Sequence, residues 1–369
     1  MLQKAMQINH TIAEFVQEIM LLAIEKNASD IHFEPQPHIL KIRFRIDGIL
    51  YDIHHSSTIT APMLTNYLKI QANLDIAEKR LPQDGRYPIK NKLNKNYICR
   101  VSTLPILHGE KVVLRLLKND GNILSIEHLG LEPEQKIIFQ KNIDKPQGLI
   151  LITGPTGSGK TTTLYTALSL LNSNERNITT IEDPIEIELE NINQLNVNPK
   201  IGLNFNHALR AILRQDPDII MVGEIRDRET AKMAIHAAQT GHLVLSTLHT
   251  NNSVESLTRL TMMGISSLDL VESLNLIIAQ RLARKCCKHC KTTMENIGCQ
   301  YCILGYHGRT GIYELFEMNE TTKMLLLNGA PPNKIAKEIH LSTLWENGLS
   351  KVNAGIITQN ELQRSIGEK

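Results

Sequence analysis

Aromatic side chains and long apolar runs are both scarce in this sequence of 369 residues. Aromatics amount to 4%, so aliphatic residues must form most of any core. No apolar run approaches the roughly 18 residues that a membrane-spanning helix needs. The first residues, MLQKAMQINH, lack the charged-then-apolar layout of a secretory signal peptide. We therefore predict a cytoplasmic protein without a direct membrane span, which partner proteins would have to hold at any membrane.

The chain also lacks a strong net charge, because 40 lysines and arginines are nearly balanced by 38 aspartates and glutamates. Proteins that track along nucleic acid need basic grooves and stacking aromatic rings. The composition therefore predicts no nucleic-acid partner. The hydrophobic fraction of 42% is ordinary for a globular protein, and the length suggests two or three domains.

The first 120 residues have the pattern of a small α+β domain. Apolar residues recur three or four positions apart over 9–27, which predicts a helix. In 40–46 they alternate with basic residues, which predicts a strand with one face in water. Asp47-Gly48 predicts a hairpin turn, and Leu50 begins the returning strand. Three further elements are predicted, a helix over 61–73 and strands near 97–103 and 111–117.

A polar, turn-rich stretch from residue 118 predicts a linker, and the second domain is expected to span 121–369. Short apolar runs alternate there with helical stretches, which is typical of a mostly parallel sheet covered by helices on both faces. From about 265 the pattern indicates mainly helices, interrupted by cysteines. The predicted strands lie at 148–153, 177–182, 218–223 and 242–247.

Residues 154–161 read GPTGSGKT and match the phosphate-loop pattern G-x-x-x-x-G-K-[ST], with a predicted strand before and a helix after. In such a loop the backbone N–H groups converge on phosphate oxygens, aided by the helix N-terminus. Lys160 would bind the β- and γ-phosphates of ATP, and the Thr161 hydroxyl would bind Mg²⁺. The alternative is a chance glycine-rich turn. The predicted nucleotide-binding residues are Gly154, Pro155, Thr156, Gly157, Ser158, Gly159, Lys160, Thr161 and Thr162.

The strand at 218–223 ends at Glu224, the acidic residue that phosphate-loop chemistry requires on a second strand. Many enzymes of this class place an aspartate before that glutamate, but Gly223 stands here. Glu224 would therefore hold the water of the magnesium ion or activate the attacking water alone. The alternative is a solvated loop carboxylate.

Only six cysteines are present, and five of them lie between 286 and 302. Two C-x-x-C pairs, each able to present two thiolates, predict a closed tetrahedral Zn²⁺ site that holds structure and does no chemistry. Cys286 has no partner at the right spacing, and Cys99 is expected to be a buried small hydrophobe. Reduced cysteines without metal are the alternative. The predicted ligands are Cys287, Cys290, Cys299 and Cys302, in a lobe of about 286–302 followed by a helical part of about 303–369.

The chain resembles the ATPase family of type II secretion and type IV pilus assembly, in its zinc-containing export or assembly type. The likeness runs from about 20 to 365 and includes the stretches ASDIHFEP, RFRIDG and LDIAEKRLPQDGR of the first region. Gly223 before the glutamate is normal for this family. Four boxes occur in the family's order: Walker A at 154–161, an acidic Asp box at 181–186, an atypical Walker B box at 220–227 and a His box at 240–251.

The resemblance implies a PAS-like N-terminal domain, a RecA-like ATPase core and a homohexamer with ATP sited between the two domains. It implies that Arg86 and Arg100 reach the phosphates, with Arg115 a weaker candidate. Glu186 is preferred over Glu182 for placing water. His249, more than His242, is expected to sense the γ-phosphate or a neighbouring subunit. The predicted catalytic set is Glu224, Glu186, Arg86, Arg100 and His249.

The resemblance further implies a motor that acts through an inner-membrane platform protein, peripheral to that membrane. Larger family members begin with an extra N-terminal domain, and this chain begins almost at ASDIHFEP, so we expect that domain to be missing and recruitment to differ. Two other functions stay open, a RecA-like nucleic-acid translocase and a low-turnover nucleotide-binding regulator. Stimulation by single-stranded DNA would favour the first, and turnover unaffected by Glu224→Gln the second.

Overall fold

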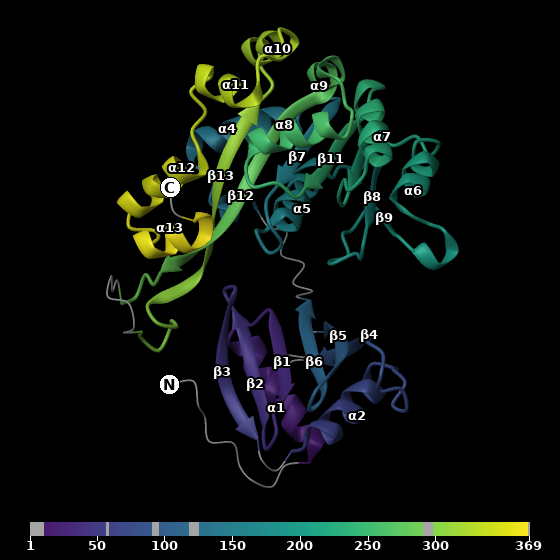
Figure 1. Ribbon diagram of the computed structural model, residues 1–369, viewed down its shortest axis with the longest axis vertical. Helices are drawn as coiled ribbons and strands as arrows, with labels where there is room; N and C mark the ends of the chain where they lie inside the picture. The colour runs from purple at the N-terminus through teal and green to yellow at the C-terminus, as the bar shows by residue number, and fades with distance from the viewer. Residues whose placement is uncertain (1–10, 57–58, 91–95, 118–124, 291–297, 368–369) are drawn as a thin grey trace. The chain divides into compact units, whose positions relative to one another are not determined.

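The computed structural model describes residues 11–56, 59–90, 96–117, 125–290 and 298–367 (Figure 1). The chain divides into two compact units, Met1–Gly121 and Asn122–Lys369. The predicted linker begins within 118–124, which lies outside the described residues. Among the residues described, none of the helices has the length and apolar character to cross a membrane.

An antiparallel six-stranded sheet and two helices form the first unit. The strand order is β3-β2-β1-β6-β5-β4. Strands β1 and β6 form the central pair, with β2 and β3 on one side and β5 and β4 on the other. The helices predicted over 9–27 and 61–73 are present, and so are the predicted strands. The elements are α1 (Ile12–Glu25), β1 (Asp30–Pro35), β2 (Leu40–Ile46), β3 (Ile49–Ser56), α2 (Ala61–Gln71), β4 (Gln83–Lys90), β5 (Asn96–Ile106) and β6 (Gly109–Leu117).

Strand β2 shows why this sheet has one apolar and one polar face. Its burial alternates along the strand, with the apolar side chains inside and the basic ones half-buried. The turn that follows needs left-handed backbone at both positions, and Asp47 (φ 49°) and Gly48 (φ 86°) adopt it. Helix α1, the first element of the unit, begins with a reciprocal capping box formed by Thr11 and Glu14.

The second unit contains a seven-stranded sheet in the order β13-β12-β7-β11-β10-β8-β9. The strands are parallel except β13, which runs antiparallel to β12 at the edge. The four strands predicted for this region are present, whereas β9, with little apolar pattern, was not predicted. The strands are β7 (Gly148–Thr153), β8 (Ile178–Glu182), β9 (Asn193–Asn196), β10 (Ile219–Val222), β11 (Leu243–Leu248), β12 (Leu274–Cys286) and β13 (Tyr306–Glu317).

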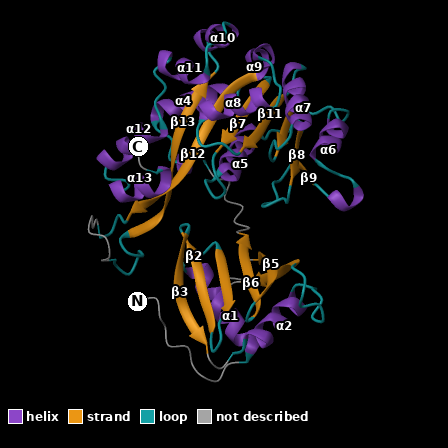
Figure 2. Ribbon diagram, in the orientation of Figure 1, coloured by secondary structure: helices purple, strands orange, loops and turns teal. Residues whose placement is uncertain are grey.

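Helices cover both faces of this sheet, as Figure 2 shows. Apolar side chains of α4 and α5 pack on one face, and those of α6 to α9 pack on the other, where residues of α10 and α11 join them. The helices are α3 (Ile126–Leu129), α4 (Pro133–Ile143), α5 (Lys160–Leu171), α6 (Phe205–Ile212), α7 (Arg228–Gln239), α8 (Ser253–Met262), α9 (Ser267–Ser273), α10 (Glu320–Leu327), α11 (Pro332–Glu338), α12 (Leu344–Asn353) and α13 (Gln359–Ile366).

The prediction of a mainly helical region from about 265 is wrong for its middle part. Strands β12 and β13 form a long antiparallel hairpin, and β12 also pairs in parallel with β7. Most of β12 is buried on both faces, so its side chains form a near-continuous apolar run without the alternation that marks a half-exposed strand. Helices resume only after Glu317. The cysteine lobe therefore lies at the end of a β-hairpin, not between helices.

Candidate active site and metal centre

The phosphate loop joins the end of β7 to the start of α5. Gly154, Gly157 and Gly159 all have positive φ, which the L side chains of other residues rarely adopt. A Cβ atom at Gly154 would lie 2.5 Å from the carbonyl oxygen of Gln280, so the loop also needs glycine for space. The backbone N–H groups at the start of α5 have no partner within the helix and point into this loop.

Two side chains of the loop have groups that suit a phosphate ligand. The ammonium of Lys160 donates to the carbonyl oxygens of Gly154 at 2.8 Å and Pro155 at 3.0 Å. Burial lowers the pKa of Lys160 to about 8, Glu224 opposes that shift and Arg281 adds to it. The Ser158 hydroxyl is buried without a hydrogen-bond partner in the described structure. A half-buried cation and a buried, unsatisfied hydroxyl are both stabilised by a bound polyphosphate.

The remaining predicted loop residues lie at the surface of this site. Pro155 and Thr156 are exposed, and Thr161 and Thr162 are half-buried in the first turn of α5. An open pocket of about 520 Å³ is lined mainly by α8 and by the loop after β11, which includes His249, and Pro155 of the phosphate loop also lines it. The pocket therefore borders the phosphate loop at Pro155, and Lys160 and Glu224 are not among its lining residues.

Glu224 and His249 meet at the ends of neighbouring parallel strands. Glu224 follows β10 and His249 follows β11, and the Nε2 atom of His249 lies 3.3 Å from one carboxylate oxygen of Glu224. Arg226 forms an ion pair with the other oxygen. Only 15% of the Glu224 side chain is exposed, whereas His249 is half exposed. The carboxyl end of a parallel sheet is where such folds bind ligands.

The glycine before Glu224 has a steric reason. A Cβ atom at Gly223 would lie 3.0 Å from the carbonyl oxygen of Ile181, tighter than side chains normally tolerate. Its N–H donates to that same oxygen at 2.8 Å, and its own carbonyl accepts from the Thr247 hydroxyl at 2.7 Å. An aspartate at 223 would therefore disturb the contacts that set the direction of Glu224.

The two glutamates of the acidic box differ in environment. Glu182 is buried, and its carboxylate accepts hydrogen bonds from Tyr165, Thr180 (2.6 Å) and Gln194 (3.0 Å). Burial beside this carboxylate raises the pKa of Tyr165. Glu186 is exposed, and its backbone N–H donates to the Tyr165 hydroxyl at 3.3 Å. The carboxylate of Glu182 is therefore held inside the fold by hydrogen bonds, whereas Glu186 lies at the surface.

His242 lies away from the phosphate loop, at the start of β11. Its Nδ1 atom lies 2.9 Å from the carbonyl oxygen of Ala237, and its carbonyl accepts from Gly148 N–H at 3.1 Å. These contacts tie the end of α7 to β7. His242 therefore makes contacts that hold neighbouring elements together, and His249 is the histidine that lies beside Glu224.

In the first unit, three arginines form a row across β4, β5 and β6. Arg86 is the register partner of Arg100, and Arg100 is the partner of Arg115, so all three project from the same face. Arg115 donates to buried Asp30 at 2.8 Å, while Arg100 contacts exposed Asp84 at 3.8 Å. Like charges opposite each other destabilise a sheet, so an anion bound at Arg86 and Arg100 would stabilise it.

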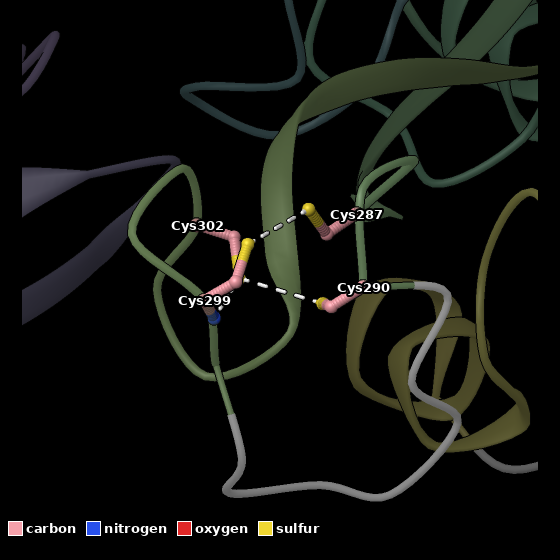
Figure 3. A group of neighbouring side chains, drawn as sticks. All are labelled: Cys287, Cys290, Cys299 and Cys302. Atoms are coloured by element: carbon pink, nitrogen blue, oxygen red, sulfur yellow. Dashed lines mark hydrogen bonds between the residues drawn. The ribbon is translucent and has the colours of Figure 1, made fainter.

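Four cysteine side chains converge where β12 ends and β13 begins. Cys287 and Cys290 face Cys299 and Cys302 (Figure 3), with all four sulfurs within 4.8 Å of one another. The Sγ–Sγ distances of 3.8 Å for Cys287–Cys299 and 3.8 Å for Cys290–Cys302 match the edges of about 3.8 Å that follow from a tetrahedron with Zn–S bonds of about 2.3 Å. The donor set therefore fits Zn²⁺ with no open ligand position.

The other two cysteines lie outside this cluster. Cys286 is still in β12, where its N–H donates to Ile356 O at 2.9 Å, and Cys287 follows it into the lobe. This resolves which of the adjacent cysteines faces the other three. Cys99 is buried in β5, and burial raises the pKa of its thiol to about 12. It is an inert core residue, as predicted.

Sequence reasoning missed two residues beside the phosphate loop, Gln280 and Arg281. Both lie in β12, which the sequence pattern suggested was helical. Gln280 is buried and accepts a hydrogen bond from the Thr163 hydroxyl at 2.8 Å. The signal that could have found them is the presence of polar residues in the otherwise apolar run LNLIIAQRL. A polar side chain that is buried needs a hydrogen-bond partner.

Comparison with known proteins places this arrangement among secretion and pilus proteins. A family profile described as "Type II/IV secretion system protein" matches residues 6–364. The chain is 46% identical to the type IV pilus assembly ATPase PilB of Acinetobacter baylyi over 97% of this chain and 66% of that protein. It is 43% identical to type II secretion system protein E of Pseudomonas aeruginosa, over 97% and 76%. The chain spans about two thirds of the length of the pilus assembly ATPases that it matches.

Solved structures share the fold of this chain. The crystal structure of the pilus retraction motor PilT with bound ADP superposes with a TM-score of 0.70 at 29% identity, covering 95% of this chain and 96% of that one. The ATPase DotB of Legionella pneumophila has the same fold, with a TM-score of 0.78 at 24% identity over 98% of both chains.

Proposed function

Since this chain belongs to the type II/IV secretion system protein family, we propose that it is an ATPase that powers assembly of a type II secretion pseudopilus or a type IV pilus. The observation that carries this proposal is the convergence of the phosphate loop, Glu224 and His249 at the carboxyl ends of neighbouring parallel strands. A competence system built on similar fibres is included in the proposal.

The chemistry assigned to the site is attack of water on the γ-phosphorus of ATP. Backbone N–H groups of the phosphate loop and Lys160 hold the phosphates, and Glu224 accepts a hydrogen bond from the attacking water. The γ-phosphorus–oxygen bond to ADP breaks as the new bond to water forms, and His249 orients the Glu224 carboxylate. Thr161 would hold Mg²⁺, which neutralises charge on the phosphates when bound. Glu186, at the surface, is proposed to help place the water.

We further propose that the second unit is a RecA-like core and the first a PAS-like domain. Six parallel strands with helices on both faces, and a phosphate loop after strand β7 in the interior of the sheet, support a RecA-like core in the second unit. A six-stranded antiparallel sheet with two helices supports a PAS-like first unit. We assign residues 1–120 and 121–369 to these two domains.

Arg86 and Arg100 are proposed to act on the phosphates of bound nucleotide. An arginine fork stays charged at every working pH and binds phosphate oxygens in pairs. The adjacent like charges of the two side chains support this role, since an anion removes their repulsion. Arg115 is held by Asp30 and is assigned to the sheet.

The four cysteines are proposed to bind one structural Zn²⁺ ion, which would join the two strands of the hairpin at its far end. The closed sulfur set leaves no site for substrate, so the ion would supply stability and not chemistry. By resemblance, this zinc motif favours the assembly or export type of motor over the retraction type.

The proposed partners are further copies of this chain, in a homohexamer, and an inner-membrane platform protein. The relatives are called pilus assembly and secretion proteins, which supports a place at the cytoplasmic side of the inner membrane, held there by partners.

Magnesium-dependent ATP hydrolysis by the purified protein tests the proposal. We expect turnover by the wild type, none by Lys160→Ala, and no stimulation by single-stranded DNA. In the source cell, Lys160→Ala is expected to abolish surface fibres or secretion. A wild-type protein that neither binds nor hydrolyses ATP would overturn the proposal, and strong stimulation by DNA would favour a translocase.

A further inference from the structure

Strand β12 passes directly behind the phosphate loop. The carbonyl oxygen of Gln280 would lie 2.5 Å from a Cβ atom at Gly154, and the Gln280 side chain would meet one at Gly159 at 2.8 Å. The Gln280 side chain is also hydrogen-bonded to Thr163 in α5. The backbone at 280 is therefore the fixed support against which the phosphate loop rests.

Arg281, the next residue of β12, connects the backbone at 280 to the loop that carries His249. Arg281 is 8% exposed, and its Nη1 atom donates to Gln280 O at 3.0 Å while Nη2 donates to Asn251 O at 2.8 Å. Asn251 lies two residues after His249, and its N–H donates to Glu255 in α8 at 2.9 Å. One guanidinium thus bridges two carbonyl groups, one behind the phosphate loop and one in the His249 loop.

The second buried arginine of the same strand has a different environment. Arg284 forms an ion pair with buried Glu361 at 2.8 Å and stacks on the ring of Tyr306 at 4.0 Å. In the described part of the chain Arg281 forms no ion pair, and its guanidinium donates hydrogen bonds to carbonyl oxygens. Burial lowers the pKa of Arg281, and the nearby carboxylates of Glu255 and Glu314 oppose that shift without pairing with the guanidinium. The burial of this cation is thus only partly compensated, so a stability role alone does not account for Arg281.

We propose that Arg281 is a positioning residue of the ATPase site, whose guanidinium fixes the His249 loop against the strand that supports the phosphate loop. The inference rests on the proposed ATPase function. The contact between His249 and Glu224 spans two loops, so a shift of one loop separates them. Arg281 sets that distance without touching nucleotide. A lysine ammonium lacks the planar fork and does not replace both hydrogen bonds in the same geometry.

The test measures kcat and the Kd for magnesium-ATP separately in Arg281→Met and Arg281→Lys. Because misplacement of a catalytic group by about 1 Å can cost roughly a hundredfold in rate, we expect kcat to fall at least about tenfold in Arg281→Met and less in Arg281→Lys. Kd should stay within about threefold, because the phosphate loop itself is intact. Arg284→Lys is the matched control, with a lower Tm allowed but kcat and Kd unchanged.

A double-mutant cycle with His249→Ala gives a result that general damage would not. If Arg281 acts through His249, the kcat loss from Arg281→Met is at least about threefold smaller in the His249→Ala background. Additive losses would overturn the inference, and so would wild-type kcat in Arg281→Lys and Arg281→Met. Failure of both Arg281 variants to fold, while Arg284→Lys folds, would assign Arg281 to stability and overturn it as well.

These outcomes are separate from failure of the proposed function. A wild-type protein without ATP hydrolysis refutes the proposed ATPase, whatever the variants do. Wild-type hydrolysis together with an unaffected Arg281→Met refutes the positioning role alone.

Discussion

The imidazole Nε2 atom of His249 lies 3.3 Å from the Oε2 atom of Glu224, although the two residues are 25 positions apart in the sequence. The other oxygen of this carboxylate pairs with Arg226. The carboxylate is therefore oriented from both sides and cannot turn freely. A fixed orientation is what a group that must align a water molecule requires.

Replacing Glu224 by glutamine removes the charge and keeps the shape of the side chain. We expect kcat for ATP hydrolysis to fall by roughly a hundredfold or more, as for other preorganised groups in an active site. ATP binding should persist, because Lys160 and the phosphate loop are unchanged. Steady-state turnover and equilibrium binding of a fluorescent ATP analogue measure the two effects.

Glu229→Gln, at an exposed position in the first turn of α7, is the matched control and should retain turnover. Equal turnover in Glu224→Gln and wild type would reject the assigned role and favour a regulator with little hydrolysis.

Binding of ATP should weaken above about pH 8. Burial lowers the pKa of Lys160 from its usual 10.5 to about 8, so the free protein loses this ammonium as pH rises. Phosphate needs the charged form, and binding then requires uptake of a proton. We expect Kd to rise by up to about tenfold per pH unit over the next units.

Calorimetry in buffers of different ionisation enthalpy measures this proton uptake directly. In Lys160→Arg, whose side chain stays charged, the pH dependence should vanish even though binding is weaker. A Kd that stays constant between pH 7 and 9.5 in the wild type contradicts the prediction.

One zinc ion per chain should be found in the purified protein by elemental analysis. Cys290→Ser and Cys302→Ser should each lower that content to near zero and lower the Tm by several degrees, because metal binding to a preformed site stabilises the folded state. Cys286→Ser, whose sulfur lies outside the cluster, should keep the metal. Loss of zinc in Cys286→Ser with retention in Cys302→Ser would show that the ligand set is wrong.

Arg100→Ala should slow ATP turnover by about tenfold or more while ATP binding changes little, because arginine stabilises the charge that develops on the phosphates during transfer. The same result is expected for Arg86→Ala. Lys41→Ala removes a surface ion pair with Asp52 in the same unit and serves as control. Unchanged kcat in both arginine variants would assign them to the surface of the sheet.

Part of the site could be predicted because it is local in the chain. The phosphate loop needs glycines at fixed offsets between a strand and a helix, and each C-x-x-C pair presents two thiolates by itself. The family boxes are local for the same reason. Strands at 148–153 and 218–223 were predicted from short apolar runs, and β7 and β10 lie there.

The hairpin of β12 and β13 was not predictable from periodicity, because strands buried on both faces and buried helices both give apolar runs. Burial of β12 between β7 and β13 decides the question. The same hairpin brings Gln280 and Arg281 behind the phosphate loop and closes the cysteine cluster at its end.

The glycine-rich loop, the two C-x-x-C pairs and the family could be identified from the sequence alone, since short-range spacing and residue chemistry suffice for these. Folding was needed to show that His249 meets Glu224, that Glu182 is buried among hydrogen-bond donors and that three arginines of β4, β5 and β6 share one row. Those relationships depend on strand order and register, which arise from packing between segments far apart in the chain.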